Sequence, residues 1–268
     1  MPKHGLIDLG NPVADHPLNR GLVGWWLPLP NNSGGSNLHD ITSKRNVAAF
    51  TNAPGWATAP NNSRSLLYNG TTNYLTCSKT LLSSETKMSF VASILPAAGS
   101  SGSTRTIIGW GTNGGPQFRV NTTDVLGFVK QDIASIGAGT GTVTLGAWNH
   151  VVGTYDSSSG AYQFWINGVD AGGGTNSQAL VAGAPIFGRH GTSGVEFFSG
   201  RIGDVRIIAG RVMTRSEVFA NYREWRAGYP NLLRRWSRKS FAASAGGGAT
   251  FKSAWARNAN TVLGLGQT

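Results

Sequence analysis

Paired carboxylates would be the clearest sign of hydrolytic chemistry in this chain. A retaining glycosidase needs an acid and a nucleophile about 5–5.5 Å apart, a separation that acidic residues two or four positions apart on one strand provide. The sequence contains four glutamates, and none has an acidic residue at either spacing. They are Glu85, Glu196, Glu217 and Glu224. We therefore expect no glycosidase activity.

Nucleophilic catalysis has equally little support in the sequence. The five histidines are scattered, and neither a G-x-S-x-G nor an H-E-x-x-H pattern accompanies them. They are His4, His16, His39, His150 and His190. His150 shares an expected strand face with Val152 and Thr154, which favours a structural histidine over a general base. The single cysteine, Cys77, excludes an intramolecular disulfide and is expected to be a small buried strand residue. On these grounds we expect no enzyme.

Exposed aromatic rings would be the signature of sugar binding, because they present an apolar surface with a polar edge. Trp26, Trp56 and Trp110 fall at expected strand ends or in loops, where their rings could stack on a sugar. The alternative for each is a tryptophan of the core or of a subunit interface, which is the commoner role. The three residues are therefore candidate glycan-stacking positions with a structural alternative.

Positive charge is concentrated toward the C-terminus. Residues 201–268 hold 12 Lys and Arg against 3 Asp and Glu, whereas residues 1–200 hold 11 against 9. Beyond residue 230 there are six basic residues and no acid, together with a Gly/Ala-rich spacer and a few apolar side chains. The residues expected to attach this tail to a partner are Arg234, Arg235, Trp236, Arg238, Lys239, Phe251 and Trp255. This pattern predicts docking onto an acidic protein surface. Nucleic acid is not the expected partner, because no helix-turn-helix, RNP or zinc pattern occurs.

The composition describes one large all-β domain with extensions. The chain has 268 residues, 40% of them hydrophobic, 38 of them glycine and only 13% charged. Average proteins are about 25% charged, so this chain suits short strands joined by tight turns, with surfaces that neighbours cover. No apolar run reaches the ~18 residues of a membrane span. The N-terminus lacks the apolar region of a secretory signal, so we expect a soluble protein made in the cytoplasm, with no membrane partner.

Residues 148–168 organise the expected strands. A β-branched and aromatic run, Trp148–Tyr155, is followed by turn residues 156–160 and by a second run, Ala161–Ile166. Asn167-Gly168 then supplies the two positive-φ residues of a tight hairpin turn. Further strands, separated by turn clusters, are expected at Val47–Thr51, Met88–Leu95, Arg105–Trp110, Gln117–Asn121, Val125–Lys130, Thr140–Leu145, Pro185–Arg189 and Val195–Ile208.

One helix signal follows the strands. Thr214-Arg-Ser-Glu217 is a capping box, in which each end residue satisfies the other's free N–H group. The apolar residues after it share one helical face. They are Val218, Phe219, Tyr222 and Trp225. The expected organisation is an N-terminal arm at residues 1–20, a single domain at 21–229 and a basic Gly/Ala-rich tail at 230–268.

Four short motifs carry a family resemblance. W-N-H-V at 148–151, T-Y-D at 154–156 and N-G at 167–168 occur in order, and Gly200–Ile208 is similar to a closing strand of pattern G-x-I-D-x-V-R-I-Y with one residue inserted before the Asp. Over Gly21 to about Trp225 the chain resembles laminin-G-like, concanavalin A-like domains. The resemblance implies an all-β, two-sheet antiparallel jelly-roll sandwich with one short C-terminal helix and extended terminal arms.

The resemblance also raises the question of calcium, which several members of the family bind at a loop edge. Calcium takes six to eight oxygen ligands, several of them carboxylates. Many relatives have three acids where this chain has Asn69, Thr72 and Asn73. Asp156 and Asp204 are the weak remaining candidates, and each is expected to satisfy local N–H groups instead. We expect no cofactor and no metal.

Two hypotheses of different kinds follow. The first is a non-enzymatic structural protein of a bacteriophage virion, such as a capsid decoration or a head or tail accessory protein. It would be located in the virion, present in many copies or as a homo-oligomer, and attached through its terminal extensions to other virion proteins such as a capsid protein. The alternative is a carbohydrate-binding or adhesion module for host-surface glycans.

Overall fold

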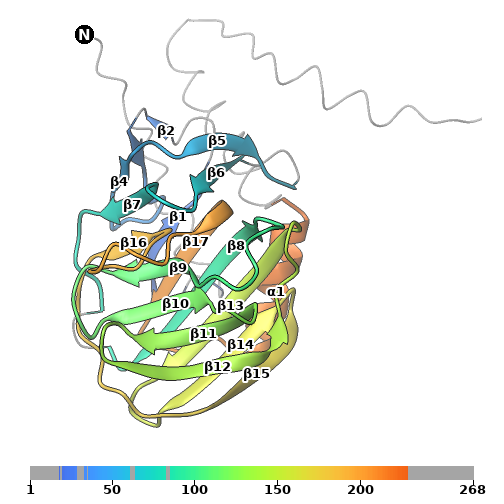
Figure 1. Cartoon of the computed structure of the whole chain (residues 1–268). Coiled ribbons are helices and arrows are strands. Elements are labelled where there is room, and N and C mark those ends of the chain that lie inside the picture. The colour runs from blue at the N-terminus through green and yellow to red at the C-terminus, as the bar shows by residue number, and fades with distance from the viewer. Residues whose placement is uncertain are drawn as a thin grey trace, which may run out of the picture. The chain divides into compact units, whose positions relative to one another are not determined.

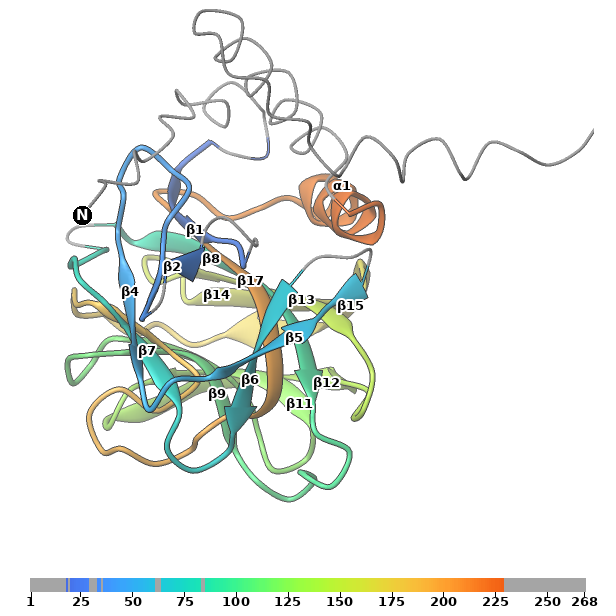
Figure 2. The same ribbon diagram turned by 90° about the horizontal axis from the view of Figure 1, so that it is seen from above.

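The computed structural model describes residues 18, 20–28, 33–34, 36–60, 64–82 and 85–228. These residues form two facing antiparallel sheets, with helix α1 (Arg215–Arg226) against the outer face of one of them (Figures 1 and 2). The expected all-β sandwich with one short C-terminal helix is therefore confirmed. The basic tail and most of the N-terminal arm lie outside the described residues.

The first sheet, sheet A, has the strand order β15-β14-β13-β8-β17-β6-β5, and β1 also pairs with β17. Its strands are β1 (Leu22–Trp26), β5 (Gly55–Thr58), β6 (Arg64–Asn69), β8 (Lys87–Pro96), β13 (Asn149–Asp156), β14 (Ala161–Ile166), β15 (Val169–Thr175) and β17 (Ser199–Ala209). The central strands of this sheet, β8 and β17, are buried almost throughout, because the other sheet covers one face and α1 packs on the opposite face.

The second sheet, sheet B, has the strand order β12-β11-β10-β9-β16-β7-β4-β3-β2. Its strands are β2 (Ser33–Gly34), β3 (Asn37–Leu38), β4 (Ala48–Thr51), β7 (Tyr74–Cys77), β9 (Arg105–Trp110), β10 (Pro116–Val120), β11 (Val125–Lys130), β12 (Ala134–Thr142) and β16 (Pro185–Phe187). The burial of β7 alternates along the strand, with Leu75 and Cys77 in the core. This alternation is what a strand with one buried face requires.

A cluster of phenylalanines fills the space between the sheets. Phe90 and Phe164 come from sheet A, and Phe118 and Phe128 come from sheet B. The centroid of the Phe128 ring lies 5.3 Å from that of Phe118 and 5.0 Å from that of Phe164. Aromatic pairs at such separations add about 0.5–1.5 kcal/mol each beyond the burial of their surface. The two sheets are thus joined at their centre by interlocking rings.

The expected central hairpin is confirmed as β13 and β14. Asn167 and Gly168 both have positive φ, 53° and 77°, as the tight turn into β15 requires. Phe164 lies in the core, whereas Trp148 precedes β13 and is only partly buried. The expectation that Trp148 belongs to the strand was therefore wrong by one residue.

Helix α1 begins with the expected capping box. The Thr214 hydroxyl accepts from the Glu217 N–H, and the Glu217 carboxylate accepts from the Thr214 N–H. Val218 packs on the outer face of sheet A, but Phe219 is 51% exposed. Asn221 is buried instead, because its side-chain carbonyl accepts a hydrogen bond from His150. No helix among the described residues is both long enough and apolar enough to span a membrane.

The edge strands β12 and β15 face each other on one side of the sandwich. A Cβ added to Gly139 of β12 would lie 2.4 Å from the carbonyl oxygen of Ala171 in β15, and one added to Gly172 would lie 2.9 Å from the Thr140 nitrogen. Only glycine permits such an approach at these positions. The two sheets therefore nearly close on this side through direct backbone contact.

Candidate functional site

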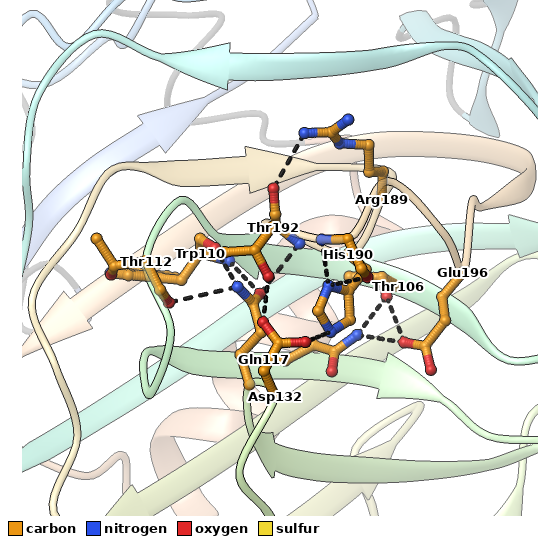
Figure 3. Close-up of polar contacts among 12 residues, drawn as sticks. Thr106, Trp110, Thr112, Gln117, Asp132, Arg189, His190, Thr192 and Glu196 are labelled. Atoms are coloured by element: carbon orange, nitrogen blue, oxygen red, sulfur yellow. Dashed lines mark hydrogen bonds and ion pairs between the residues drawn. The ribbon is translucent and has the colours of Figure 1, made fainter.

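The segment between β16 and β17, residues 188–198, runs beside β9 of sheet B (Figure 3). We call it the 188–198 loop. Its Arg189–Gly191 part lies over the outer face of β9, and Phe198 at its end packs in the core. Its Glu196 carbonyl accepts from the Thr106 N–H of β9, and its Gly188 N–H donates to the Ile107 carbonyl. Gln117 and Arg119 of β10 reach this loop, whereas Phe118 between them points into the core. The loop therefore covers polar side chains that would otherwise line the sheet surface.

The loop is seated on β9 by two glycines and one glutamine. A Cβ on Gly191 would lie 1.5 Å from the Trp110 carbonyl oxygen, and a Cβ on Gly109 would lie 2.5 Å from the Arg189 carbonyl oxygen. The Gln131 side-chain oxygen accepts from the N–H groups of Trp110 and Gly191, both at 3.0 Å. The Gln131 side chain thus bridges the loop and β9 by accepting a backbone N–H from each. The backbone of the loop packs directly against the backbone of β9.

An ion pair stands at the end of the loop nearer to β17. The Arg119 guanidinium donates to the Glu196 carboxylate at 3.0 Å, and each side chain is 23% exposed. The other oxygen of Glu196 accepts from the Gln117 amide and the Thr106 hydroxyl. Glu196 has a positive φ of 54° and precedes β17, so the expectation that it lies in a strand was wrong. Strain of this kind in a non-glycine residue is often found at functional sites.

The other polar group of the loop is centred on His190. Its Nδ1 lies 2.8 Å from the Ser193 hydroxyl, and its Nε2 lies 3.4 Å from a carboxylate oxygen of Asp132. The second Asp132 oxygen accepts a hydrogen bond from Thr192. Asp132 comes from the turn between β11 and β12, about sixty residues earlier in the chain (Figure 3). The fold thus brings together a hydroxyl, an imidazole and a carboxylate.

An arginine and two aromatic rings occupy the side of the loop that faces β7. The Arg189 guanidinium carbon lies 4.0 Å from the centroid of the Tyr74 ring, and the centroids of Tyr74 and Phe197 are 6.4 Å apart. All three side chains are partly exposed. A guanidinium over an aromatic face is held by the ring quadrupole, so Arg189 is fixed in position.

Two of the three tryptophans proposed for sugar stacking are buried. Trp26 is 0% exposed, its indole N–H donates to the Asn46 carbonyl at 2.7 Å, and its ring meets Phe187 edge to face. Trp110 is also 0% exposed and lies beside Phe90. The glycan-stacking role is therefore wrong for both residues, and the structural alternative, a core tryptophan, is confirmed, because both side chains point into the core. Trp56 of β5 is partly buried against the core and beside Phe50, so part of its ring reaches the surface.

The two aspartates considered for calcium have other partners. Asp156 accepts from the N–H and hydroxyl of Ser158 and lies 3.5 Å from the Lys87 ammonium; the Ser158 hydroxyl is the main cause that lowers the pKa of Asp156. Asp204 is buried and accepts from the Ser93 hydroxyl at 2.6 Å and from Arg206 at 3.3 Å. Among the described residues, no three His, Cys, Asp or Glu side chains gather as metal ligands would.

The loop equivalent to the acidic loop of the resembled family is closed by its own hydrogen bonds. The Asn69 side-chain oxygen accepts from the N–H groups of Thr71, Thr72 and Asn73 at 3.0, 2.9 and 3.2 Å. The Asn73 oxygen accepts from the Asn69 N–H. The amides therefore supply the turn with the acceptors that it needs.

The seven proposed tail residues, from Arg234 to Trp255, lie outside the described residues. The polar groups of the 188–198 loop were missed, because Asp132 and His190 are remote in sequence. Two signals pointed to them: H-G-T-S at 190–193 is a compact polar turn, and Glu196 stands alone in an otherwise apolar run.

Comparison with known families gives a match over more than half of the chain. A family model described as the concanavalin A-like lectin/glucanases superfamily matches residues 69–219, which include the whole 188–198 loop. A search of curated proteins found no relative of significantly similar sequence.

Solved structures of similar fold include several with bound sugars. Domain 4 of an extracellular GH43 arabinanase from Geobacillus stearothermophilus, in complex with arabinotriose, has a TM-score of 0.57 and 19% identity, over 74% of this chain and 97% of that domain. The binding domain of botulinum neurotoxin DC in complex with SialylT has a TM-score of 0.59 and 12% identity, over 77% of this chain and 52% of that one. A Trypanosoma rangeli sialidase has a TM-score of 0.54 and 15% identity, over 76% of this chain and 33% of that one. The chain thus spans about half of the toxin domain and a third of the sialidase.

Proposed function

Because the chain belongs to the concanavalin A-like lectin/glucanases superfamily, we propose that its sandwich binds a glycan on the outer face of sheet B, beside the 188–198 loop. The observation that carries this proposal is the Arg119–Glu196 pair, which is partly exposed and held from below by Gln117 and Thr106. A guanidinium donates and a carboxylate accepts, so a fixed pair of this kind matches the vicinal hydroxyls of a sugar.

The surroundings of the pair suit a flat ligand. Across the outer face of sheet B, Arg119 lies opposite Gly127, and Gly127 lies opposite Ala138. Gln117 is fully buried, and its amide donates to the Glu196 carboxylate, so it holds that carboxylate in place without contacting a ligand itself.

Structures of the same fold support glycan binding in general. They include the arabinanase domain with arabinotriose and a sialidase with sialic acid. At identities below 20% this likeness is one of fold, so the sugar that this chain takes has to come from its own residues. We propose binding without cleavage of the glycosidic bond, because the glutamates lack the paired spacing that cleavage needs.

A glycan array with the full chain tests this proposal. We expect a defined set of glycans to bind, and we expect Arg119→Ala and Glu196→Gln to weaken binding about tenfold or more, since each removes a hydrogen bond to a charged group. Arg64→Ala, which changes an exposed arginine of β6, is the matched control and should bind normally. Loss of binding with Trp56→Ala alone would move the site to β5, and an array without any hit would contradict the proposal.

A structural role in a bacteriophage virion is a second proposal, carried by the composition of the C-terminal segment. Residues 231–268 hold six basic residues and no acid. We propose that this segment fixes the sandwich, in many copies, to an acidic surface of a capsid or tail protein. The two proposals are compatible, because they assign attachment and glycan binding to different parts of the chain.

A further inference from the structure

We propose that Ser193 is an activated nucleophile that hydrolyses carboxylic esters, with His190 as its general base and Asp132 as the residue that positions His190. The 188–198 loop provides Ser193 and His190, and the turn between β11 and β12 provides Asp132. Figure 3 shows His190 and Asp132 facing each other. This inference goes beyond glycan binding and does not depend on it. It also revises the expectation that the scattered histidines exclude nucleophilic catalysis.

The hydrogen bonds to His190 define which ring nitrogen carries the proton. Both the backbone N–H and the hydroxyl of Ser193 lie within reach of Nδ1, at 3.4 and 2.8 Å. A backbone N–H can only donate, so Nδ1 holds the lone pair and the neutral ring carries its hydrogen on Nε2. The Ser193 hydroxyl therefore donates to Nδ1, which is the arrangement that a general base requires before it removes a proton.

Asp132 is placed to hold this form of the ring. Its Oδ1 lies 3.4 Å from Nε2 of His190, and its Oδ2 accepts from the Thr192 hydroxyl. Asp132 has a left-handed backbone with φ of 60°, and its side chain points from the turn toward the loop (Figure 3). A carboxylate beside the distal nitrogen fixes the orientation of the imidazole and stabilises the imidazolium that forms during reaction.

His190 and Ser193 differ in solvent exposure, as a general base and its nucleophile should. His190 is only 6% exposed, whereas Ser193 is an exposed residue. The base is thus shielded from water and the nucleophile is open to a substrate. The alternative is a purely structural role, in which the Ser193 hydroxyl only closes its turn. That role explains the contact with His190, but it does not require a carboxylate on the other side of the imidazole ring or a buried histidine.

An arginine lies next to the glycine that follows the nucleophile in the chain. Gly194, which follows Ser193, has φ of 63° and no side chain, and the Arg189 Nη1 lies 3.5 Å from the position that a Cβ would take there. Arg189 is held by Tyr74 and donates through Nη2 to the Gly191 carbonyl at 3.0 Å. In the proposed reaction, this guanidinium supplies the positive charge that stabilises the oxyanion formed when the nucleophile adds to a carbonyl.

The proposed reaction proceeds in two balanced steps. Ser193 Oγ adds to the ester carbonyl carbon while its proton moves to His190 Nδ1; the bond to the leaving alcohol then breaks, and the alcohol oxygen takes that proton. Water next adds to the acyl-serine, gives one proton to Nδ1, and releases the carboxylic acid as the proton returns to Ser193 Oγ. The sum is ester plus water giving acid plus alcohol, with no other reactant.

Hydrolysis of p-nitrophenyl acetate by the full chain tests the proposal. We expect release of p-nitrophenol above the buffer rate and a fall of about 100-fold or more in Ser193→Ala, because both nucleophile and proton transfer are lost. Ser158→Ala is the matched control: Ser158 is also an exposed turn serine, but its hydroxyl donates to Asp156 rather than to a histidine. Its rate should equal that of the unchanged chain.

Two further measurements separate a catalytic from a structural role. A fluorophosphonate probe should label Ser193, as located by peptide mass spectrometry, and should not label Ser158. Asp132→Asn should lower kcat with little change in KM and should alter the pH profile, while Ser193→Ala keeps the melting temperature. If the unchanged chain hydrolyses the ester no faster than Ser193→Ala does, and the probe leaves Ser193 unlabelled, the proposal is wrong.

Discussion

His150 is a neutral, buried group at the junction of sheet A and α1. Its Nε2 donates to the Asn221 side-chain oxygen at 2.8 Å, and the rings of Tyr222 and Trp225 lie 5.9 and 5.7 Å away. Burial lowers the pKa of His150 to about 4; Asp204 and Asn221 oppose this shift and Arg206 adds to it. The expected structural role of His150 agrees with this burial, and its contact with Asn221 of α1 is a finding of the structure.

This environment predicts a loss of stability in mild acid. The unfolded chain takes up a proton at His150 near pH 6.5, whereas the folded chain takes it up only near pH 4. The free energy of unfolding therefore has its full value above about pH 6.5 and decreases as the pH falls from 6.5 to 4. The loss should be about 3 kcal/mol. Urea unfolding at pH 7.5, 5.5 and 4 measures it. His150→Gln should remove most of this dependence and His39→Gln should keep it; an equal slope in all three chains would contradict the assignment.

The amides of the Asn69 turn predict that calcium is not required. Asn69 and Asn73 already use their side-chain oxygens to accept backbone N–H groups, so a calcium ion would have to displace those bonds without the charge of a carboxylate to compensate. We expect the melting temperature to be the same in EDTA and in millimolar calcium. A rise of several degrees in calcium would show a site that these residues do not form.

Among the structural elements, the 188–198 loop shows how the position of a loop can depend on glycines, which have no side chain. Gly191 and Gly109 let it contact β9 directly, and Gln131 bridges the two backbones. Each polar group of the candidate site includes one residue of this loop, Glu196 in the first and His190 in the second. Its seat on the strand therefore determines the position of Glu196 and of His190 together.

Gly191→Ala should accordingly disturb stability and site at once. The added methyl group would overlap the Trp110 carbonyl, and overpacking of this kind costs typically about 1–3 kcal/mol or more. We expect a lower melting temperature, weaker glycan binding and slower ester hydrolysis in the same variant. Gly99→Ala is the control, since a Cβ at Gly99 would meet no atom within 4 Å. Equal stability of the two variants would mean that the loop does not rest on β9 as described.

Elements with a local signal were predictable from the sequence, and elements without one were not. The Asn167-Gly168 turn and the capping box of α1 are encoded by two to four adjacent residues, and both were confirmed. The strand expected at Thr140–Leu145 is instead β12, Ala134–Thr142. Its glycines and alanines carry little strand preference, so pairing with β11 and contact with β15 determine its position.

For the whole molecule, the sandwich and the basic tail should be separable. A chain that ends after Tyr229 keeps every described core residue, so we expect its melting temperature to be unchanged. If the proposed attachment to a virion is right, the shortened chain should fail to join particles in infected cells, because the six basic residues, Phe251 and Trp255 are gone. Thermal unfolding followed by circular dichroism checks the melting temperature, and the protein composition of purified particles checks incorporation. Normal incorporation of the shortened chain, or its unfolding, would contradict the assignment of the tail as the attachment device.

The candidate site shows the limit of sequence reasoning at this scale. Trp26 and Trp110 were proposed as surface residues because they stand at strand ends, but the side on which a strand residue lies depends on its register, which neighbouring strands fix. Asp132 meets His190 only because β11, β10 and β9 are adjacent in sheet B. Local sequence patterns were enough to predict the fold, whereas the site is formed by contacts between segments that are remote in sequence.

The contact between β12 and β15 also bears on how the protein avoids aggregation. An unpaired edge strand offers a row of free N–H and C=O groups to any neighbouring chain, and such edges seed edge-to-edge aggregation. Here the two glycine-rich edges at one side of the sandwich shield each other, with Gly139 against Ala171 and Gly172 against Thr140. The net charge of +11 also keeps copies of the chain apart. On this side, the covered strand edges add to that protection against association.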